Sequence, residues 1–116
     1  MDERLEKAFA IANYRATLSN QRRIINEEFE QQLVYYHNGG TFKIDQSLLT
    51  YTKMMLDLEY THDVPFLDVN NFPVIIPDVK EFFDTILLQY VTALNVYSAK
   101  FAELRSKRKI GDMLEL

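Results

Sequence analysis

The stretch that decides the fold is residues 79–104, which read VKEFFDTILLQYVTALNVYSAKFAEL. Apolar side chains recur in it every three or four residues, at Val79, Phe83, Ile86, Tyr90, Leu94, Tyr97, Phe101 and Leu104. This spacing is the period of one face of an α-helix. Because Phe82, Leu87 and Val91 widen the apolar stripe, we expect more than one neighbouring element to cover this helix.

The two ends of the helix also have sequence signals. Asp78 is followed three residues later by Glu81, the spacing of a capping box, so the helix is expected to start directly after Asp78. At the other end, the cations of residues 105–109 suit a helix C-terminus. Gly111 is the expected stop.

A second long helix is predicted upstream, because residues 2–36 contain no Gly or Pro and are rich in helix formers. The weakest helical stretch lies around Thr17, Ser19 and Asn20, so two helices joined by a kink are the alternative. Two apolar stripes run along this segment. The early one comprises Leu5, Ala8, Phe9, Ala12 and Ala16, and the later one Ile11, Tyr14, Leu18, Ile25, Phe29, Leu33 and Tyr36.

The middle of the chain is predicted to form a small sheet and a short helix. Residues 37–40, HNGG, are expected to end the first helix. Alternation over residues 41–44 predicts a strand, and apolar residues at helical spacing predict a short helix over residues 46–59 after the cap Asp45. Residues 64–76 are predicted to form a hairpin with a two-residue turn at Asn70-Asn71 or a longer loop. The strand and the hairpin together would make a three-stranded antiparallel sheet.

The predicted fold is therefore α+β and mostly α, in the order helix, strand, helix, hairpin, helix, with the two long helices antiparallel. A chain of 116 residues is near the common size of one domain. We expect residues 1–116 to be a single domain, with residues 105–116 as a basic and then acidic and apolar tail.

Composition excludes several classes of protein. A hydrophobic content of 47% with three Gly and three Pro indicates a folded chain. The net charge of −4 and the pI near 5.1 give no overall attraction to phosphate backbones. The absence of cysteine excludes disulfides and thiolate chemistry. With no signal peptide and no membrane span expected, we predict a cytoplasmic protein.

No motif of a catalytic or cofactor site is present. His37 and His62 lie far apart in the sequence, and a metal would need Asp45, Asp63 or Asp68 to converge on them. No serine lies in a nucleophile elbow. We therefore predict a protein that is not an enzyme, with no cofactor, no metal site and no small-molecule substrate.

Two features at the C-terminus are candidates for binding. The basic segment Arg105, Lys107, Arg108 and Lys109, with Arg22 and Arg23 as a second cluster, could contact nucleic acid. Its position at a helix end gives it a structural reason as well. The terminal residues Ile110, Met113, Leu114 and Leu116 could dock in a partner's groove, in the manner of C-terminal peptides that bind polymerase sliding clamps. The alternatives are that they fold back on the helices of the chain or are disordered.

Association is the favoured hypothesis. The two long helices carry more apolar surface than a short helix and a small sheet can cover. We expect a homodimer or a place in a larger assembly, and the candidate interface residues are Tyr14, Phe29, Tyr36, Tyr90, Tyr97 and Phe101.

Several short strings resemble small uncharacterised proteins of T4-like marine bacteriophages, including cyanophages. They are MDERLEKA at 1–8, NYRATLSNQRR at 13–23, YHNGGTF at 36–42, FPV at 72–74 and FF at 82–83. The resemblance carries no activity, cofactor or site residue. It implies an infected bacterial cytoplasm or a virion, and a role in virion assembly or in control of a phage or host complex. The alternative function is a nucleic-acid, replication or transcription accessory.

Overall fold

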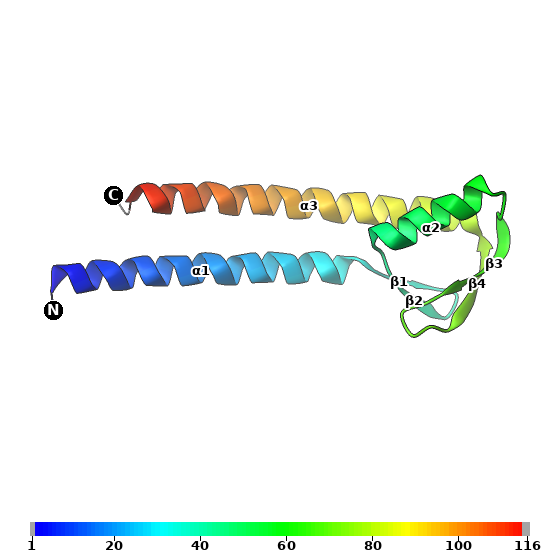
Figure 1. Ribbon diagram of the computed structural model, residues 1–116, viewed down its shortest axis with the longest axis horizontal. Helices are drawn as coiled ribbons and strands as arrows, with labels where there is room; N and C mark the ends of the chain where they lie inside the picture. Colours follow the sequence, from blue (N-terminus) through cyan, green and yellow to red (C-terminus); the bar gives the residue numbers. More distant parts are fainter. Residues whose placement is uncertain (1, 115–116) are drawn as a thin grey trace. The chain divides into compact units, whose positions relative to one another are not determined.

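The computed structural model describes the backbone of residues 2–114 and the side chains of residues 2–109. The described chain is α+β and mostly helical, as the sequence predicts (Figure 1). Its elements in order are α1 (Glu3–Gln32), β1 (Val34–His37), β2 (Gly40–Lys43), α2 (Gln46–Asp57), β3 (His62–Leu67), β4 (Pro73–Asp78) and α3 (Val79–Leu114).

The chain divides into two compact units. The helical unit consists of Met1–Phe29 and Asn95–Leu116, and the mixed unit consists of Glu30–Leu94. The mixed unit therefore contains both hairpins, helix α2, the last residues of α1 and the first half of α3.

The first hairpin of the mixed unit corrects the predicted end of the first helix. Helix α1 ends at Gln32, and β1 pairs with β2 in the register Tyr35↔Phe42. The turn is Asn38-Gly39, and both residues have positive φ, 48° and 82°. A two-residue Asn-Gly turn is a strong local signal for a hairpin, and β1 consists largely of β-branched and aromatic residues. The prediction of helix through residue 36 was wrong because these preferences outweigh the helix formers upstream.

The second hairpin is confirmed, with β3 and β4 paired in the register Val64↔Ile76. Its connection is the longer loop, because β3 ends at Leu67 and β4 begins at Pro73. The predicted three-stranded sheet is wrong, because the described strands form two separate two-stranded sheets. β1, which the sequence had placed in a helix, pairs with one edge of β2, and neither β3 nor β4 pairs with the other edge. A single backbone hydrogen bond, from Val69 N–H to the Thr41 carbonyl at 2.9 Å, joins the two hairpins in place of a strand ladder.

The core of the mixed unit is built around Phe82 on α3. Its ring contacts Phe42 of β2 and Phe66 of β3, with centroids 5.3 and 5.5 Å away in edge-on geometry. Ile44, Ile76, Val79 and Ile86 are fully buried around it. Helix α2 begins as predicted at its cap, because the Asp45 carboxylate accepts the Leu48 N–H at 2.8 Å.

Helix α3 begins at Val79 as predicted, and the Asp78 carboxylate accepts the Glu81 N–H at 3.1 Å. The helix continues through Gly111 to Leu114, so the prediction of a stop at Gly111 was wrong. A glycine in a helix interior costs only about 1 kcal/mol relative to alanine, which the flanking helical residues can outweigh. Leu87, Val91 and Leu94, which were expected on the covered side of the helix, are exposed. Ala93 is buried instead of its neighbour Leu94.

The helical unit is an antiparallel pair of segments from α1 and α3, which lie side by side in Figure 1. Phe29 stacks on Tyr97 with ring centroids 4.7 Å apart, and Lys100 pairs with Glu28 at 2.7 Å. Toward the N-terminus of α1, the Tyr14 hydroxyl donates to the Lys107 carbonyl. Helix α1 is continuous across residues 17–20, so the alternative of two separate helices does not hold.

Candidate functional site

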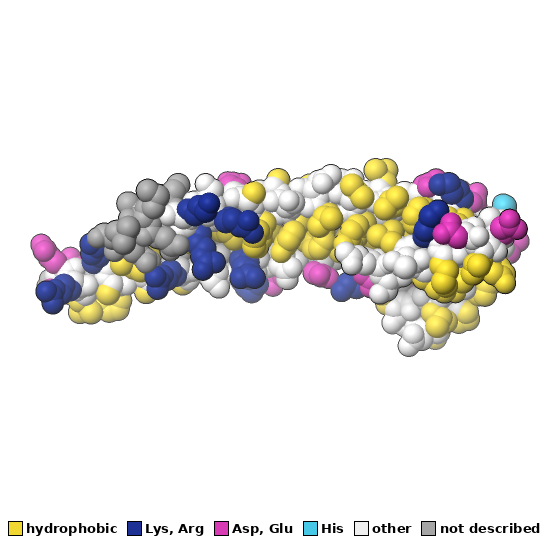
Figure 2. All heavy atoms as spheres, turned by 45° about the horizontal axis from the view of Figure 1, so that its top comes forward, with side chains coloured by type: hydrophobic (Ala, Val, Ile, Leu, Met, Phe, Trp, Pro, Cys, Tyr) yellow, Lys and Arg dark blue, Asp and Glu magenta, His cyan; other side chains and the backbone are white. Residues whose placement is uncertain are grey.

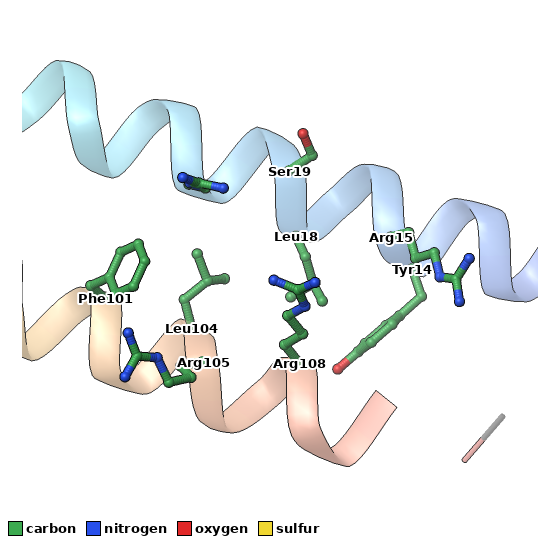
Figure 3. Close-up of a pocket in the computed structure, with 9 residues that line it drawn as sticks. Tyr14, Arg15, Leu18, Ser19, Phe101, Leu104, Arg105 and Arg108 are labelled. Carbon is green, nitrogen blue, oxygen red and sulfur yellow. The ribbon is translucent and has the colours of Figure 1, made fainter. Parts of the chain in front are cut away.

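The cations that the sequence singled out are brought partly together in the helical unit. Arg22 of α1 and Arg105 and Arg108 of α3 line one cavity of about 540 Å³, and Arg15 lines it as well. Figure 3 shows Arg108 extending from α3 toward α1. Figure 2 shows Lys and Arg side chains gathered over this pair of helices. Residues far apart in the sequence therefore contribute four guanidinium groups to one site.

The remaining predicted cations lie outside this cavity. Arg23 pairs with Glu27 at 3.0 Å, and Lys107 approaches Glu103 at 3.6 Å. Lys109 is exposed and does not line the cavity. By contrast, no carboxylate among the described side chains lies within ion-pair distance of Arg22, Arg105 or Arg108. The predicted cations thus include two near a carboxylate, three that line the cavity, and Lys109, which does neither.

The walls of the cavity are apolar where they are not arginine. Leu18, Leu104 and Phe101 contribute apolar surface, and Tyr14 and Ser19 complete the lining. The guanidinium carbons of Arg105 and Arg22 lie 5.3 and 6.0 Å from the centroid of the Phe101 ring. Cation–π contact at this range stabilises a guanidinium and restricts its orientation. Among the residues whose side chains the structure describes, no acidic one lines the cavity.

Arg15 is the cavity residue that the sequence analysis did not name. Arg15 and Arg22 are seven residues apart, which places them on the same face of α1 two turns apart. Arg105 and Arg108 are three residues apart, so they also share a helix face. The sequence shows that each pair of arginines shares a helix face. It does not show that these two faces lie opposite each other.

The candidate interface residues have several different environments. Phe29, Tyr97 and Phe101 stack on one another within the chain, with Tyr97 and Phe101 centroids 5.9 Å apart, and all three are half-buried. Tyr90 is half-buried, and Tyr14 is 36% exposed. Tyr36 on β1 is 75% exposed. Of this set, Tyr36 leaves the most of its ring available to a partner.

An apolar surface on α1 is more exposed than most of the candidate interface residues. Every residue of the early stripe is exposed, and Leu5 and Phe9 are exposed by 47% and 54%. We call this stripe, Leu5, Ala8, Phe9, Ala12 and Ala16, the alanine face. The later stripe, from Ile11 to Phe29, contains the half-buried residues that lie toward α3. The side of α1 away from that contact therefore presents apolar surface to solvent.

The mixed unit has one buried carboxylate. Asp68, 8% exposed, accepts backbone N–H groups from Phe72, Asn70 and Thr41. The hydrogen bond from Phe72 is the largest cause of a pKa below the ordinary value for this carboxyl group. Among the described residues, no group of three or more His, Asp or Glu side chains is arranged to hold a metal ion. Asp68 is accounted for by these structural hydrogen bonds.

The candidate docking tail falls outside the described side chains. The backbone of Ile110, Met113 and Leu114 belongs to α3, and Leu116 lies beyond the described residues. Docking of this tail stays a prediction. None of the described helices has a stretch that is both apolar and long enough to cross a membrane.

No family model, no curated protein and no solved structure matches this chain. The proposals below therefore rest on the residues and geometry described above.

Proposed function

We propose that this chain is a non-enzymatic assembly protein, and that its first partner is a second copy of itself, bound through the alanine face of α1. The observation that carries the proposal is the lack of a core in the helical unit. Leu104, 8% exposed, is the single buried hydrophobic residue among the described residues of this unit, and α1 has none. Two helices without a buried layer between them gain little stability from packing.

Exposed apolar residues in the helical unit supply the surface for association. Leu5, Phe9, Ile24 and Val96 are large hydrophobic residues that are at least 38% exposed. Burying a large aliphatic or aromatic side chain is worth about 1.5–3 kcal/mol. A helical pair from a second copy would complete a bundle of four helices and give Leu5 and Phe9 a shared core.

The alanine face is suited to a copy of itself. Leu5 and Phe9 are bulky and lie at one end, while Ala12 and Ala16 are small and lie at the other. In an antiparallel pair of α1 helices related by a twofold axis, the bulky end of each copy would lie against the small end of the other. Small residues let two helices approach closely, and a twofold interface requires such a self-complementary surface.

The experiment compares two alanine variants at exposed helical positions. Ala12→Glu places a charge on the alanine face, and Ala99→Glu makes the same change on α3 outside that face. Sedimentation equilibrium should show a dimer for the wild-type chain and for Ala99→Glu, and a monomer for Ala12→Glu. A wild-type monomer at micromolar concentration, or equal association of both variants, would contradict the proposal.

Cross-linking tests the antiparallel arrangement, because the chain has no cysteine of its own. Ala12→Cys lies near the centre of the proposed contact and should form a disulfide-linked dimer rapidly on mild oxidation. Ala99→Cys is the matched control and should cross-link only by slow collision. Equal cross-linking rates for the two variants would place the contact elsewhere.

The alternative function, a nucleic-acid accessory, stays a prediction. The geometry favours a discrete site over an extended basic stripe, because Arg23 and Lys107 are near carboxylates while Arg22, Arg105 and Arg108 face one cavity. The phage setting, with a place in virion assembly or in a host complex, likewise stays a prediction.

A further inference from the structure

We propose that Arg22, Arg105 and Arg108 form a binding site for a small molecule that carries two or more linked phosphate groups. The inference goes beyond self-association and does not depend on it. It starts from the charge of the cavity, which among the described side chains is lined by four arginines and by no acidic residue.

The charge distribution of the chain makes this cavity unusual. The protein has 17 acidic and 13 basic side chains and a net charge of −4. Several described cations elsewhere on the long helices have carboxylate partners, as in Arg23–Glu27, Lys80–Asp84 and Lys100–Glu28. Arg22, Arg105 and Arg108 have none among the described side chains. The positive charges that share this cavity repel one another. An anion bound between them would attract each of them and so offset the repulsion.

The type of cation indicates the type of anion. The basic residues that line the cavity within the described part of the chain are arginines, although lysines occur nearby on α3. The guanidinium group is planar and presents paired N–H donors that match the oxygens of phosphate, whereas an ammonium group acts as a point charge. Phe101 lies within cation–π range of Arg22 and Arg105. The guanidinium groups of these two arginines are therefore partly oriented before a ligand binds.

The size of the cavity indicates more than one phosphate group. Its volume of about 540 Å³ is within the range of sites for small molecules and much larger than a single phosphate ion. Cations from two helices surround it, so a chain of linked phosphates could contact α1 and α3 together. The apolar surface of Leu18 and Leu104 leaves room for an organic group, as in a nucleotide.

The experiment measures binding of tripolyphosphate, ATP, adenosine and a 20-nucleotide single-stranded DNA by calorimetry. Wild-type protein should bind tripolyphosphate and ATP with saturation and should not bind adenosine. The triple variant Arg22→Gln, Arg105→Gln, Arg108→Gln should bind them at least about a hundredfold more weakly, since each charge-assisted contact is worth about tenfold or more. ATP but not tripolyphosphate binding would assign recognition to the organic group and overturn the phosphate site.

The control variant removes three cations outside the cavity, Arg4→Gln, Arg23→Gln and Lys53→Gln, and should bind both ligands like wild type. Equal weakening in the two triple variants would reduce the effect to net charge and overturn the proposal. A further variant, Arg22→Lys, Arg105→Lys, Arg108→Lys, keeps the positive charge but removes the paired N–H donors of the guanidinium groups. It should bind tripolyphosphate at least about tenfold more weakly than wild type.

A measurement on the wild-type chain keeps the test independent of variant folding. In a proton–nitrogen NMR spectrum that observes arginine Nε–H groups, tripolyphosphate should shift the signals of Arg22, Arg105 and Arg108 and leave Arg4 unchanged. Uniform small shifts of all arginines, or no saturable binding, would overturn the proposal. Tighter, strongly salt-dependent binding of the DNA through the same three arginines would also overturn it, in favour of a nucleic-acid site.

Discussion

The carboxylate of Asp68 accepts a hydrogen bond from the backbone N–H of Thr41 at 3.3 Å, and so connects the loop between β3 and β4 to the first hairpin. Asp68 also accepts the N–H groups of Asn70 and Phe72, both at 2.9 Å. One side chain thus holds its own loop closed and joins two hairpins that share no strand ladder.

The first prediction concerns the pH dependence of this connection. The Phe72 N–H, with those of Thr41 and Asn70, holds the pKa of Asp68 below its ordinary value of 3.8. The stability that the ionised carboxylate contributes is complete above the ordinary pKa and is lost as the pH falls through the lowered one. Between pH about 5 and about 2, the melting temperature of wild type should fall more steeply than that of Asp68→Asn. Parallel curves for the two proteins would contradict this.

The second prediction concerns Gln89 of α3, which donates from Nε2 to the carbonyls of Gln32 and Val34 at 2.7 and 3.1 Å. Gln89→Glu keeps the shape but replaces the donor by an acceptor that faces two carbonyl oxygens. We expect a loss of about 1–3 kcal/mol in the free energy of unfolding, measured by urea denaturation. Gln31→Glu adds the same charge near the end of α1 without removing this donor, and should have a clearly smaller effect.

The third prediction concerns the ring cluster around Phe82. Beyond its contacts with Phe42 and Phe66, the Phe82 ring lies 5.9 Å from Tyr35 and 5.4 Å from His37. Phe82→Ala should therefore lower the free energy of unfolding by about 3–5 kcal/mol. Phe72 is 65% exposed, and Phe72→Ala should cost far less. Similar losses for the two variants in chemical denaturation would show that Phe82 is not the centre of the core.

The fourth prediction separates two neighbouring glycines. A Cβ at Gly40 would lie 2.5 Å from Cγ2 of Val74, so Gly40→Ala should overpack this site and cost about 1–3 kcal/mol. In the double variant Gly40→Ala, Val74→Ala the side chain at position 74 is shorter. The loss in the free energy of unfolding should then be smaller than the sum of the losses of the two single variants. Gly39 faces open space at φ +82°, so Gly39→Ala should be destabilising through backbone strain, with no such coupling to Val74.

The fifth prediction follows from the proposed self-association. If two copies share a core, folding is linked to dimerisation, and the melting temperature of wild type should rise with protein concentration. Scanning calorimetry over a hundredfold range of concentration measures this. For Ala12→Glu the melting temperature should be lower and independent of concentration, whereas Ala99→Glu should behave like wild type.

The candidate binding site shows where prediction from sequence ended. The sequence analysis named Arg22, Arg105 and Arg108 among a larger set of cations, and the structure places these three in one cavity. It did not name Arg15, and it expected no small-molecule ligand. Which cations face a cavity and which approach a carboxylate depends on the rotation of each helix about its own axis. A list of charged residues does not contain that rotation.

The sequence by itself determined the elements whose signals are local. The start of α3 at Val79 follows from a capping box and a helical period, and the hairpin of β3 and β4 from an alternating pattern around Asn70-Asn71. Only the tertiary structure decided that the hairpin of β1 and β2 and the hairpin of β3 and β4 share no strand ladder, which leaves two sheets in place of one. It also decided that the alanine face of α1 is exposed. Pairing between separate hairpins and the burial of a helix face depend on segments distant in the chain, so no local pattern can specify them.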